Sequence, residues 1–414
     1  MKIAIVSKAD QTAGGASRVA SDLTRELNDL GHEVVHFAAW ADRHSKQDVN
    51  FVYGGSLCKR AIIQAGKVAR RLGFVETIPF EAPSAVLKLR SFDIVHFHDT
   101  SSSFSPLTLL AASRFAKVVW TFHDCSPFTG GCIYPQMADC TRYVSGCGEC
   151  PLNGEWPLDG YFDTTRSALR ARRLLHSRGD LAYVAPSQWM ADTALASGNV
   201  PRRPTVISNM IDTRTFAPPV DRHGLRRRLG LPHDRLVIAL SSGNVSDPRK
   251  AIRSSLEAIR EISDFGTRPM VVLIGKPDSR IGGHLEGIDF VSTGFVSDRD
   301  ELAQWLSASD AFVTTSIADN QPLAIMEAMA CGTPVYGWPV GGIREMISDG
   351  VNGRSIASMD PTELGTAIYR DHFSGSLLSM RAGTRDYAVT NYSSEQFAAG
   401  HEKLYTDILT GTSK

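Results

Sequence analysis

Residues 309–342 read SDAFVTTSIADNQPLAIMEAMACGTPVYGWPVGG, and no other stretch says more about the fold. Positions 310–315 are rich in β-branched and aromatic residues, as is typical of a buried parallel strand. Residues 319–322 offer capping side chains and a proline suited to the first turn of a helix. Apolar residues follow at helical spacing until CGTP at 331–334 ends the helix. The stretch therefore predicts a strand, a helix and a second strand, closed by a Gly-Gly turn.

The junction between that strand and that helix has the chemistry of a phosphate site. A helix that begins at the carboxyl end of a parallel strand directs backbone N–H groups at one point, which suits a phosphate. Asp319 before the helix and Glu327 within it add carboxylates, which accept hydrogen bonds from sugar hydroxyls. Two interpretations fit this segment: a site for a phosphorylated sugar, and an ordinary βαβ unit with a surface pair of carboxylates.

The same residues resemble a known signature. An acidic residue, seven intervening residues, a glutamate, and then AMACGTPV with a Gly-Gly turn resemble the signature of retaining glycosyltransferases of family 4. The resemblance implies an α/β protein with the GT-B fold, in which two Rossmann-like domains face each other across a cleft. Asp319 stands where most members of that family have glutamate.

The resemblance also implies a domain plan. We expect an N-terminal Rossmann-like acceptor domain at 1–205, with a cysteine-rich insert at 125–151. A C-terminal Rossmann-like donor domain is expected at 206–385. The last segment, 386–414, is expected to be a helix that packs back on the N-terminal domain.

Composition narrows the class of protein. The chain has 414 residues, 43% of them hydrophobic and 21% charged, and its formal net charge is zero, so nothing argues for nucleic acid. Residues 1–6 read as a first strand and not as the apolar region of a signal peptide, and no run approaches the roughly 18 apolar residues of a membrane span. The seven cysteines then favour reduced thiols or a metal over disulfides. We therefore expect a cytoplasmic enzyme.

The N-terminal half begins like a nucleotide-binding βαβ unit. Residues 2–7 predict a strand, and Gly14 and Gly15 open a helix that runs to Leu30. The full GxGxxG pattern is absent, so the two glycines also fit a simple tight turn. The resemblance places this turn against the donor phosphates or the acceptor. It further implies that His123, after the strand at 117–122, is the active-site histidine close to the transferred sugar.

Two segments are strongly basic. Residues 57–76 predict a helix with one apolar and one basic side, which fits a surface helix packed on its own domain or a helix lying on anionic lipid headgroups. The resemblance favours the second use in part, because the family often acts on lipid-linked acceptors at the inner face of the membrane. The arginine-rich helix at 164–178 fits a solvated face or a contact with an anionic acceptor.

The cysteine-rich insert is the least generic part of the chain. Residues 123–151 read HDCSPFTGGCIYPQMADCTRYVSGCGECP. Cys132, Cys140, Cys147 and Cys150 are separated by seven, six and two residues, and the last two form a knuckle-like CGEC pair suited to two corners of a zinc site. Two disulfides or four unlinked thiols are the alternatives. A subset of family 4 enzymes in surface polysaccharide assembly carries a similar insert. We carry a structural zinc forward as the prediction.

The C-terminal half carries the expected diphosphate site. A strand from 236 leads into SSGN at 241–244 and then DPRK at 247–250. The family places an arginine directly after this glycine, Gly243, and a lysine seven positions after it. Lys250 fits, but Asn244 replaces the arginine, which leaves Arg249 as the expected helper.

Two further segments of this half resemble known motifs. Gly294, Phe295 and Val296 match the loop that meets the nucleobase in the family. Asp298-Arg299-Asp300 resembles the metal-binding DxD of another transferase fold, but it precedes a helical pattern. We therefore interpret it as a helix cap and first turn.

Together these features imply a retaining, metal-independent glycosyltransferase that takes a UDP- or GDP-sugar as donor. Asp319 would hold the transferred sugar, Glu327 the ribose, and His123 the sugar near the reaction centre. The diphosphate would lie against Lys250 and a segment made of Asn320, Gln321, Pro322 and Leu323.

The expected acceptor is a saccharide or lipid-linked saccharide in bacterial exopolysaccharide, capsule or O-antigen assembly. Two other functions fit the same residues. One is a GT-B sugar-nucleotide epimerase, and the other is a non-catalytic assembly partner, for which the departures at Asn244 and Asp319 are the motive.

Overall fold

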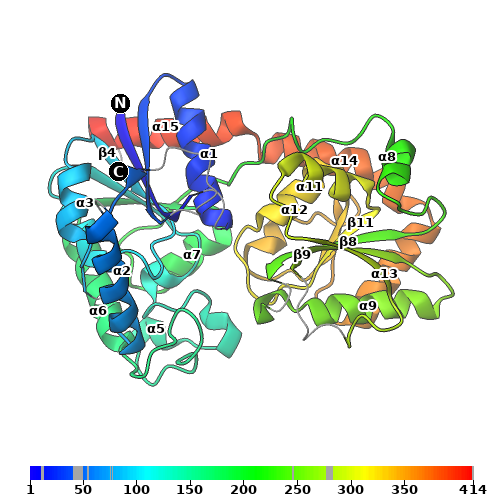
Figure 1. The fold of residues 1–414 in the computed structure, drawn as a ribbon, viewed down its shortest axis with the longest axis horizontal. Helices are drawn as coiled ribbons and strands as arrows, with labels where there is room; N and C mark the ends of the chain where they lie inside the picture. The colour runs from blue at the N-terminus through cyan, green and yellow to red at the C-terminus, as the bar shows by residue number, and fades with distance from the viewer. Residues whose placement is uncertain are drawn as a thin grey trace. The chain divides into compact units, whose positions relative to one another are not determined.

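The computed structural model describes residues 1–10, 14–40, 50–53, 56–74, 76, 78–244, 247–276 and 283–412. The chain divides into two compact units: unit 1 is Met1–Ser208 with Phe397–Lys414, and unit 2 is Asn209–Gln396. The domain end expected at residue 385 falls inside helix α14 (Ser376–Asn391), which lies wholly in unit 2. Only the last helix, α15 (Ser394–Thr410), returns to unit 1, where Figure 1 shows it in red.

Unit 1 is built on a parallel sheet. The described strands lie in the order β3-β2-β1-β4-β5-β6-β7, and each neighbouring pair is parallel. The strands are β1 (Lys2–Ala9), β2 (Glu33–Trp40), β3 (Asn50–Phe51), β4 (Ile94–Phe97), β5 (Lys117–Thr121), β6 (Leu181–Ala185) and β7 (Thr205–Val206). The helices are α1 (Gly15–Asp29), α2 (Ser56–Arg71), α3 (Ala82–Leu89), α4 (Pro106–Ala112), α5 (Arg142–Ser145), α6 (Thr165–Arg178) and α7 (Gln188–Ala196).

Unit 2 repeats the plan. Its described strands lie in the order β10-β9-β8-β11-β12-β13, again all parallel. The strands are β8 (Val237–Asn244), β9 (Met270–Lys276), β10 (Asp289–Gly294), β11 (Ala311–Thr314), β12 (Val335–Gly337) and β13 (Gly353–Ser355). The helices are α8 (Arg222–Arg228), α9 (Ile252–Asp264), α11 (Arg299–Ala308), α12 (Leu323–Ala330), α13 (Pro361–Phe373) and α14.

Both faces of the unit 2 sheet are covered, which explains its continuous apolar strands. Along β8, Val237 and Ala239 belong to one buried cluster, while Ile238 and Leu240 belong to another. The first cluster contains residues of α11, α12 and α14, and the second contains residues of α9 and α13. Figure 1 shows these helices above and below the sheet. Alternate side chains therefore point into two separate cores, as in doubly wound α/β folds.

The cysteine-rich insert has little regular structure. It contains the 3₁₀ turns η1 (Ser126–Phe128) and η2 (Pro135–Ala138) and the four-residue helix α5. The next regular element is α6, which contains the arginines noted in the sequence. Contacts within the insert, with α6 and with Asn199 hold it in place.

Candidate functional site

The candidate donor site lies where the strand order of unit 2 reverses. In doubly wound sheets, ligands bind at the carboxyl ends of the strands on either side of that reversal. Here those strands are β8 and β11. The turn η3 (Pro248–Lys250) follows β8, and Asp319 follows β11. Lys250 Nζ and Asp319 Oδ2 are 2.5 Å apart, and their side chains are 24% and 12% exposed. The fold thus joins two residues that the sequence singled out separately.

Helix α12 begins without the side-chain cap that the sequence suggested. Its N-cap residue is Pro322, whose side chain makes no cap hydrogen bond. The capping role expected of residues 319–322 is therefore wrong, because the Asp319 carboxylate is used by Lys250 and by the N–H of Asn320. Gln321 instead accepts a hydrogen bond from the N–H of Asn209 through Oε1, at 2.7 Å. The first turn of α12, from Leu323, keeps its N–H groups free of a side-chain cap.

Glu327 lies in the middle of α12 and is 4% exposed. It follows Asp319 by two turns' worth of chain, so the acidic pair of the signature spans the strand-to-helix junction. Asn320, between them, is 2% exposed. The signature carboxylates are therefore largely buried and are not a surface pair.

Arg249 is held differently from Lys250. Its guanidinium contacts the Asp247 carboxylate twice, with Nη2–Oδ2 at 2.6 Å and Nε–Oδ1 at 3.1 Å. Asp247 therefore matches the charge of Arg249, which limits its use as a helper for a diphosphate. Gly243 lies in β8, and the side chain of Asn244 is outside the described part of the structure.

The segment expected to meet a nucleobase closes β10. Gly294 has a φ of 68°, a left-handed conformation that suits glycine. Phe295 is 52% exposed, and Val296 packs against the core. Asp298 caps α11 by accepting hydrogen bonds from the N–H groups of Asp300 and Glu301. The interpretation of Asp298 as a helix cap is thus confirmed.

In unit 1, His123 belongs to a buried group of imidazoles. His98 Nδ1 and His123 Nε2 are 2.9 Å apart, and His96 contacts the Tyr405 hydroxyl at 2.6 Å and Thr121 at 2.7 Å. Burial, with the neighbouring His401, lowers the pKa of His123 to about 3. His123 is therefore neutral near pH 7 and acts as a hydrogen-bonding group, not as a cation.

His96 and His98 had been given no role from the sequence. Their spacing on either side of Phe97, at the end of a buried strand, was the available signal. The structure shows that they connect His123 to α15 through Tyr405. Gly15 begins α1, and its neighbour Gly14 has a φ of 127°. Gly14 therefore takes the conformation for which the turn needs glycine.

Four of the five cysteines of the insert, Cys132, Cys140, Cys147 and Cys150, face one small cavity of about 10 Å³. None of them is in a disulfide. Burial raises the pKa of Cys132 to about 12 and that of Cys147 to about 11. Across the described residues, no group of three or more His, Cys, Asp or Glu side chains is arranged to hold a metal ion. The predicted zinc therefore rests on the shared cavity, and stays a prediction.

Comparison with known proteins gives the class of these two units. A family described as Glycosyltransferase Family 4 matches residues 13–215, and one described as Glycosyl transferases group 1 matches residues 237–370. The first match lies mostly in unit 1 and the second lies in unit 2, so each unit is similar to a glycosyltransferase domain.

Among curated proteins, the chain is similar to the putative colanic acid biosynthesis glycosyl transferase WcaC of Escherichia coli K12. The two are 28% identical over 286 residues, which is 66% of this chain and 65% of that protein. A D-inositol 3-phosphate glycosyltransferase of Geodermatophilus obscurus is 34% identical over 235 residues, 53% of this chain and 49% of that protein. The chain therefore spans about half to two thirds of the length of these relatives.

Solved structures resemble the chain over nearly its whole length. Sucrose-phosphate synthase of Thermosynechococcus elongatus has a TM-score of 0.70 at 17% identity, covering 99% of each chain. HepE of Anabaena, in complex with UDP and glucose, has a TM-score of 0.67 at 16% identity, covering 98% of this chain and 100% of its own. WaaG, a lipopolysaccharide glycosyltransferase, has a TM-score of 0.64 at 15% identity, with 99% and 100% covered. The protein has the GT-B fold.

Proposed function

We propose that this protein is a retaining glycosyltransferase that moves a sugar from a UDP- or GDP-sugar to a saccharide or lipid-linked saccharide in bacterial surface polysaccharide assembly. The observation that carries the proposal is the pairing of Lys250 with Asp319 where the strand order of unit 2 reverses, within the residues that match a glycosyltransferase family. The relative WcaC, described for colanic acid biosynthesis, supports the choice of process. The UDP and glucose held by HepE support the class of donor.

The residues divide the work of the proposed reaction. As the diphosphate leaves, negative charge develops, and Lys250 with the N–H groups at the start of α12 would stabilise it without a metal. Asp319 would hold hydroxyls of the transferred sugar, and Glu327 the ribose hydroxyls. His123 would be neutral, because burial lowers its pKa. It would therefore offer the sugar a hydrogen bond without placing a second positive charge beside the one that develops at the anomeric carbon.

A donor panel tests the proposal. Purified protein would be incubated with UDP-, GDP- and ADP-sugars, and the released nucleotide and sugar would be measured with and without saccharide acceptors. We expect one nucleotide sugar to be turned over, with the anomeric configuration kept in the product. Conversion of the sugar nucleotide to an epimer without an acceptor would identify an epimerase instead. Failure to bind any nucleotide sugar by calorimetry would leave the non-catalytic assembly role.

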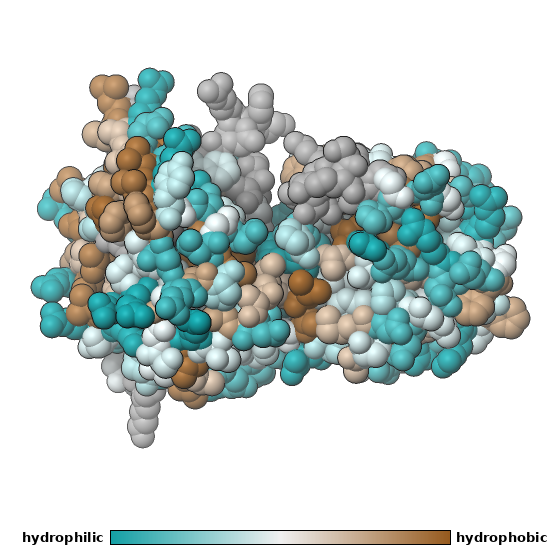
Figure 2. Space-filling model, turned by 90° about the horizontal axis from the view of Figure 1, so that it is seen from below, coloured by the Kyte–Doolittle hydropathy of each residue, from teal (hydrophilic) through white to brown (hydrophobic). Residues whose placement is uncertain are grey.

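The membrane part of the proposal rests on the surface of unit 1. Leu57 and Val68 of α2 are 78% and 58% exposed, and Tyr161 and Phe162 are 81% and 64% exposed. The N–H of Tyr161 donates a hydrogen bond to the carbonyl of Arg71, the last residue of α2. Figure 2 shows apolar side chains among hydrophilic ones on the underside of the molecule. No helix in the described ranges is long and apolar enough to cross a membrane. We propose that α2 and residues 161–162 lie on a lipid surface.

A vesicle experiment tests this part separately. We expect the double variant Tyr161→Ser/Phe162→Ser to sediment less with vesicles that contain anionic lipid, while it keeps its turnover of a soluble donor. Phe373, which is 81% exposed in unit 2, gives the matched control Phe373→Ser. Equal sedimentation of both variants and the wild type would contradict a lipid contact at this surface.

A further inference from the structure

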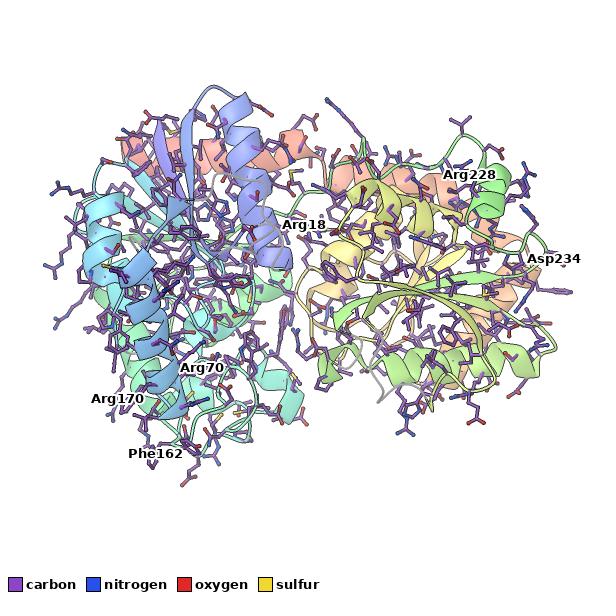
Figure 3. All side chains as sticks on the ribbon, viewed as in Figure 1. Arg18, Arg70, Phe162, Arg170, Arg228 and Asp234 are labelled. Carbon is purple, nitrogen blue, oxygen red and sulfur yellow. The ribbon has the colours of Figure 1, made fainter. Side chains whose placement is uncertain are left out.

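A second cavity in unit 1, of about 350 Å³, is lined by arginines. Arg166, Arg170 and Arg173 of α6 border it together with Leu169 and with Ser145, Gly146 and Cys147 of the insert. The three arginines are four and three residues apart, so they share one face of the helix. The lining contains three guanidinium groups and no carboxylate. Figure 3 labels Arg170 at the edge of this unit.

Neutral oxygens hold two of these guanidiniums in place. Arg173 Nε donates to Asn199 Oδ1 at 2.6 Å, and Arg173 Nη2 donates to the Val144 carbonyl at 3.1 Å. Arg166 Nε donates to the Cys147 carbonyl at 3.1 Å. Asn199 is itself fixed, because its Nδ2 donates to the carbonyls of Phe128 and Tyr143. Because these acceptors are neutral oxygens, the contacts orient the guanidiniums without neutralising their charge.

Gly148 lies close to the guanidinium of Arg166. Gly148 has a φ of 119°, and a Cβ added there would lie 3.0 Å from Arg166 Nε and 3.1 Å from Nη2. Asp163 interacts electrostatically with Arg166, but its oxygens already accept hydrogen bonds from the Cys150 N–H and from Thr165. Arg170 is exposed, and the described residues offer it no hydrogen bond or ion pair. The site is therefore built by the insert, with one arginine left for a ligand.

We propose that this cavity binds a phosphate or diphosphate group. Three guanidiniums carry a formal charge of three, which matches a group with two or three negative charges better than a single carboxylate. Guanidinium groups bind phosphate oxygens in pairs of parallel hydrogen bonds, which suits recognition of a phosphorylated ligand. The residues that make the cavity all lie in unit 1, so the proposal does not depend on the donor site of unit 2.

Inorganic pyrophosphate is the probe. Binding to the full chain would be measured by calorimetry in the presence of saturating UDP, so that the proposed donor site is occupied. We expect Arg170→Gln to weaken pyrophosphate binding by about tenfold or more, because one charge-assisted contact is lost. Arg170→Gln/Arg173→Gln should weaken it further. Arg178→Gln, on the same helix but outside the cavity, is the control and should bind like wild type. Since Arg170 is exposed and makes no hydrogen bond or ion pair with the described residues, its variant should fold like the wild type.

The source of the phosphate is decided in a second arm. The same variants would be sedimented with phosphatidylcholine vesicles that contain or lack phosphatidylglycerol. Loss of both pyrophosphate and vesicle binding supports a lipid headgroup, and loss of pyrophosphate binding alone supports a phosphorylated ligand free of the membrane. Unchanged pyrophosphate binding in the double variant, whatever the vesicles show, would overturn the site. If UDP fails to bind at all, the donor assignment fails, and the comparison of the α6 variants stands unaffected.

Discussion

Lys250 and Asp319 form an ion pair, so each side chain is a partner of the other. A donor diphosphate that approaches Lys250 would compete with Asp319 for the same ammonium. The ion pair therefore fixes the positions of both side chains before binding, and donor binding would redistribute one positive charge between a carboxylate and a diphosphate. Mutation of either residue should therefore lower activity and also affect the stability of the protein.

We expect Lys250→Ala to lower the rate of transfer by about two to three orders of magnitude, as is typical when one charge-stabilising contact is removed. Because this variant leaves the Asp319 carboxylate without its cation, it should also lose some stability. The double variant Lys250→Ala/Asp319→Asn should regain stability but not activity. Arg253→Ala, which removes an exposed cation of α9, is the control. Wild-type transfer rates in Lys250→Ala would refute the donor site.

Asp319→Glu tests the position where this chain departs from its family. The longer side chain moves the carboxylate relative to Lys250 and to the transferred sugar, so we expect the ranking of donor sugars to change more than the midpoint of thermal unfolding. The measurement is kcat/KM across the donor panel for both proteins. An identical ranking would mean that Asp319 does not contact the transferred sugar.

At the scale of elements, the insert matters because it has few backbone elements of its own. Four thiols line one cavity between its turns, and the raised pKa values of Cys132 and Cys147 show that, without a cation, those thiols stay protonated. A bound zinc would stabilise the thiolates and join segments that no sheet joins. The same insert supplies the carbonyls that orient Arg166 and Arg173.

We therefore expect about one zinc per chain when the protein is purified without a chelator. Removing it should lower the midpoint of thermal unfolding and speed proteolysis within residues 125–151, while the donor site of unit 2 still binds UDP. Cys132→Ser and Cys150→Ser should each lower the metal content, whereas Cys58→Ser, at an exposed cysteine of α2, should not. A metal content near zero, with all thiols reactive, would show that the cysteines only pack.

At the scale of the whole molecule, the last helix closes unit 1 through buried imidazoles. His401 and Tyr405 of α15 contact His96, His96 lies against His98, and His98 in turn contacts His123. Burial lowers the pKa of His401 to about 4 and that of His123 to about 3. Because burial disfavours the charged form of each imidazole, the cluster is stable only while the imidazoles are neutral.

The protein should therefore be less stable at acid pH. His401 binds a proton near pH 6.5 in the unfolded chain but only near pH 4 in the folded chain. The stability that the neutral imidazole contributes is therefore complete above about pH 6.5 and is lost as the pH falls toward 4. Each pKa unit corresponds to roughly 1.4 kcal/mol. Urea unfolding between pH 7 and 4.5 should show the loss, and His401→Gln should flatten the profile, whereas His233→Gln, at an exposed site, should not. A His401→Gln profile parallel to that of the wild type would contradict this role.

Local pattern was enough for most of the architecture. The alternation of buried strand and helix, the glycine turns and the spacing of the acidic signature specify two doubly wound units, because each depends on neighbours within a few positions. The signature also located Asp319 and Glu327. The end of α12 was found for the same reason, since Cys331 and Gly332 stop the helix by backbone geometry alone.

Contacts between distant residues set the rest. Arg172 lies in a helix for which the sequence suggests a solvated face or a contact with an anionic acceptor, yet it pairs with Glu76 at 2.5 Å, 96 positions away, and its side chain is 1% exposed. Lys250 and Asp319 meet across 69 positions, and His96 and Tyr405 across 309. No period or spacing in the sequence encodes such pairs, because a buried charge is placed only where the packed chain supplies its partner.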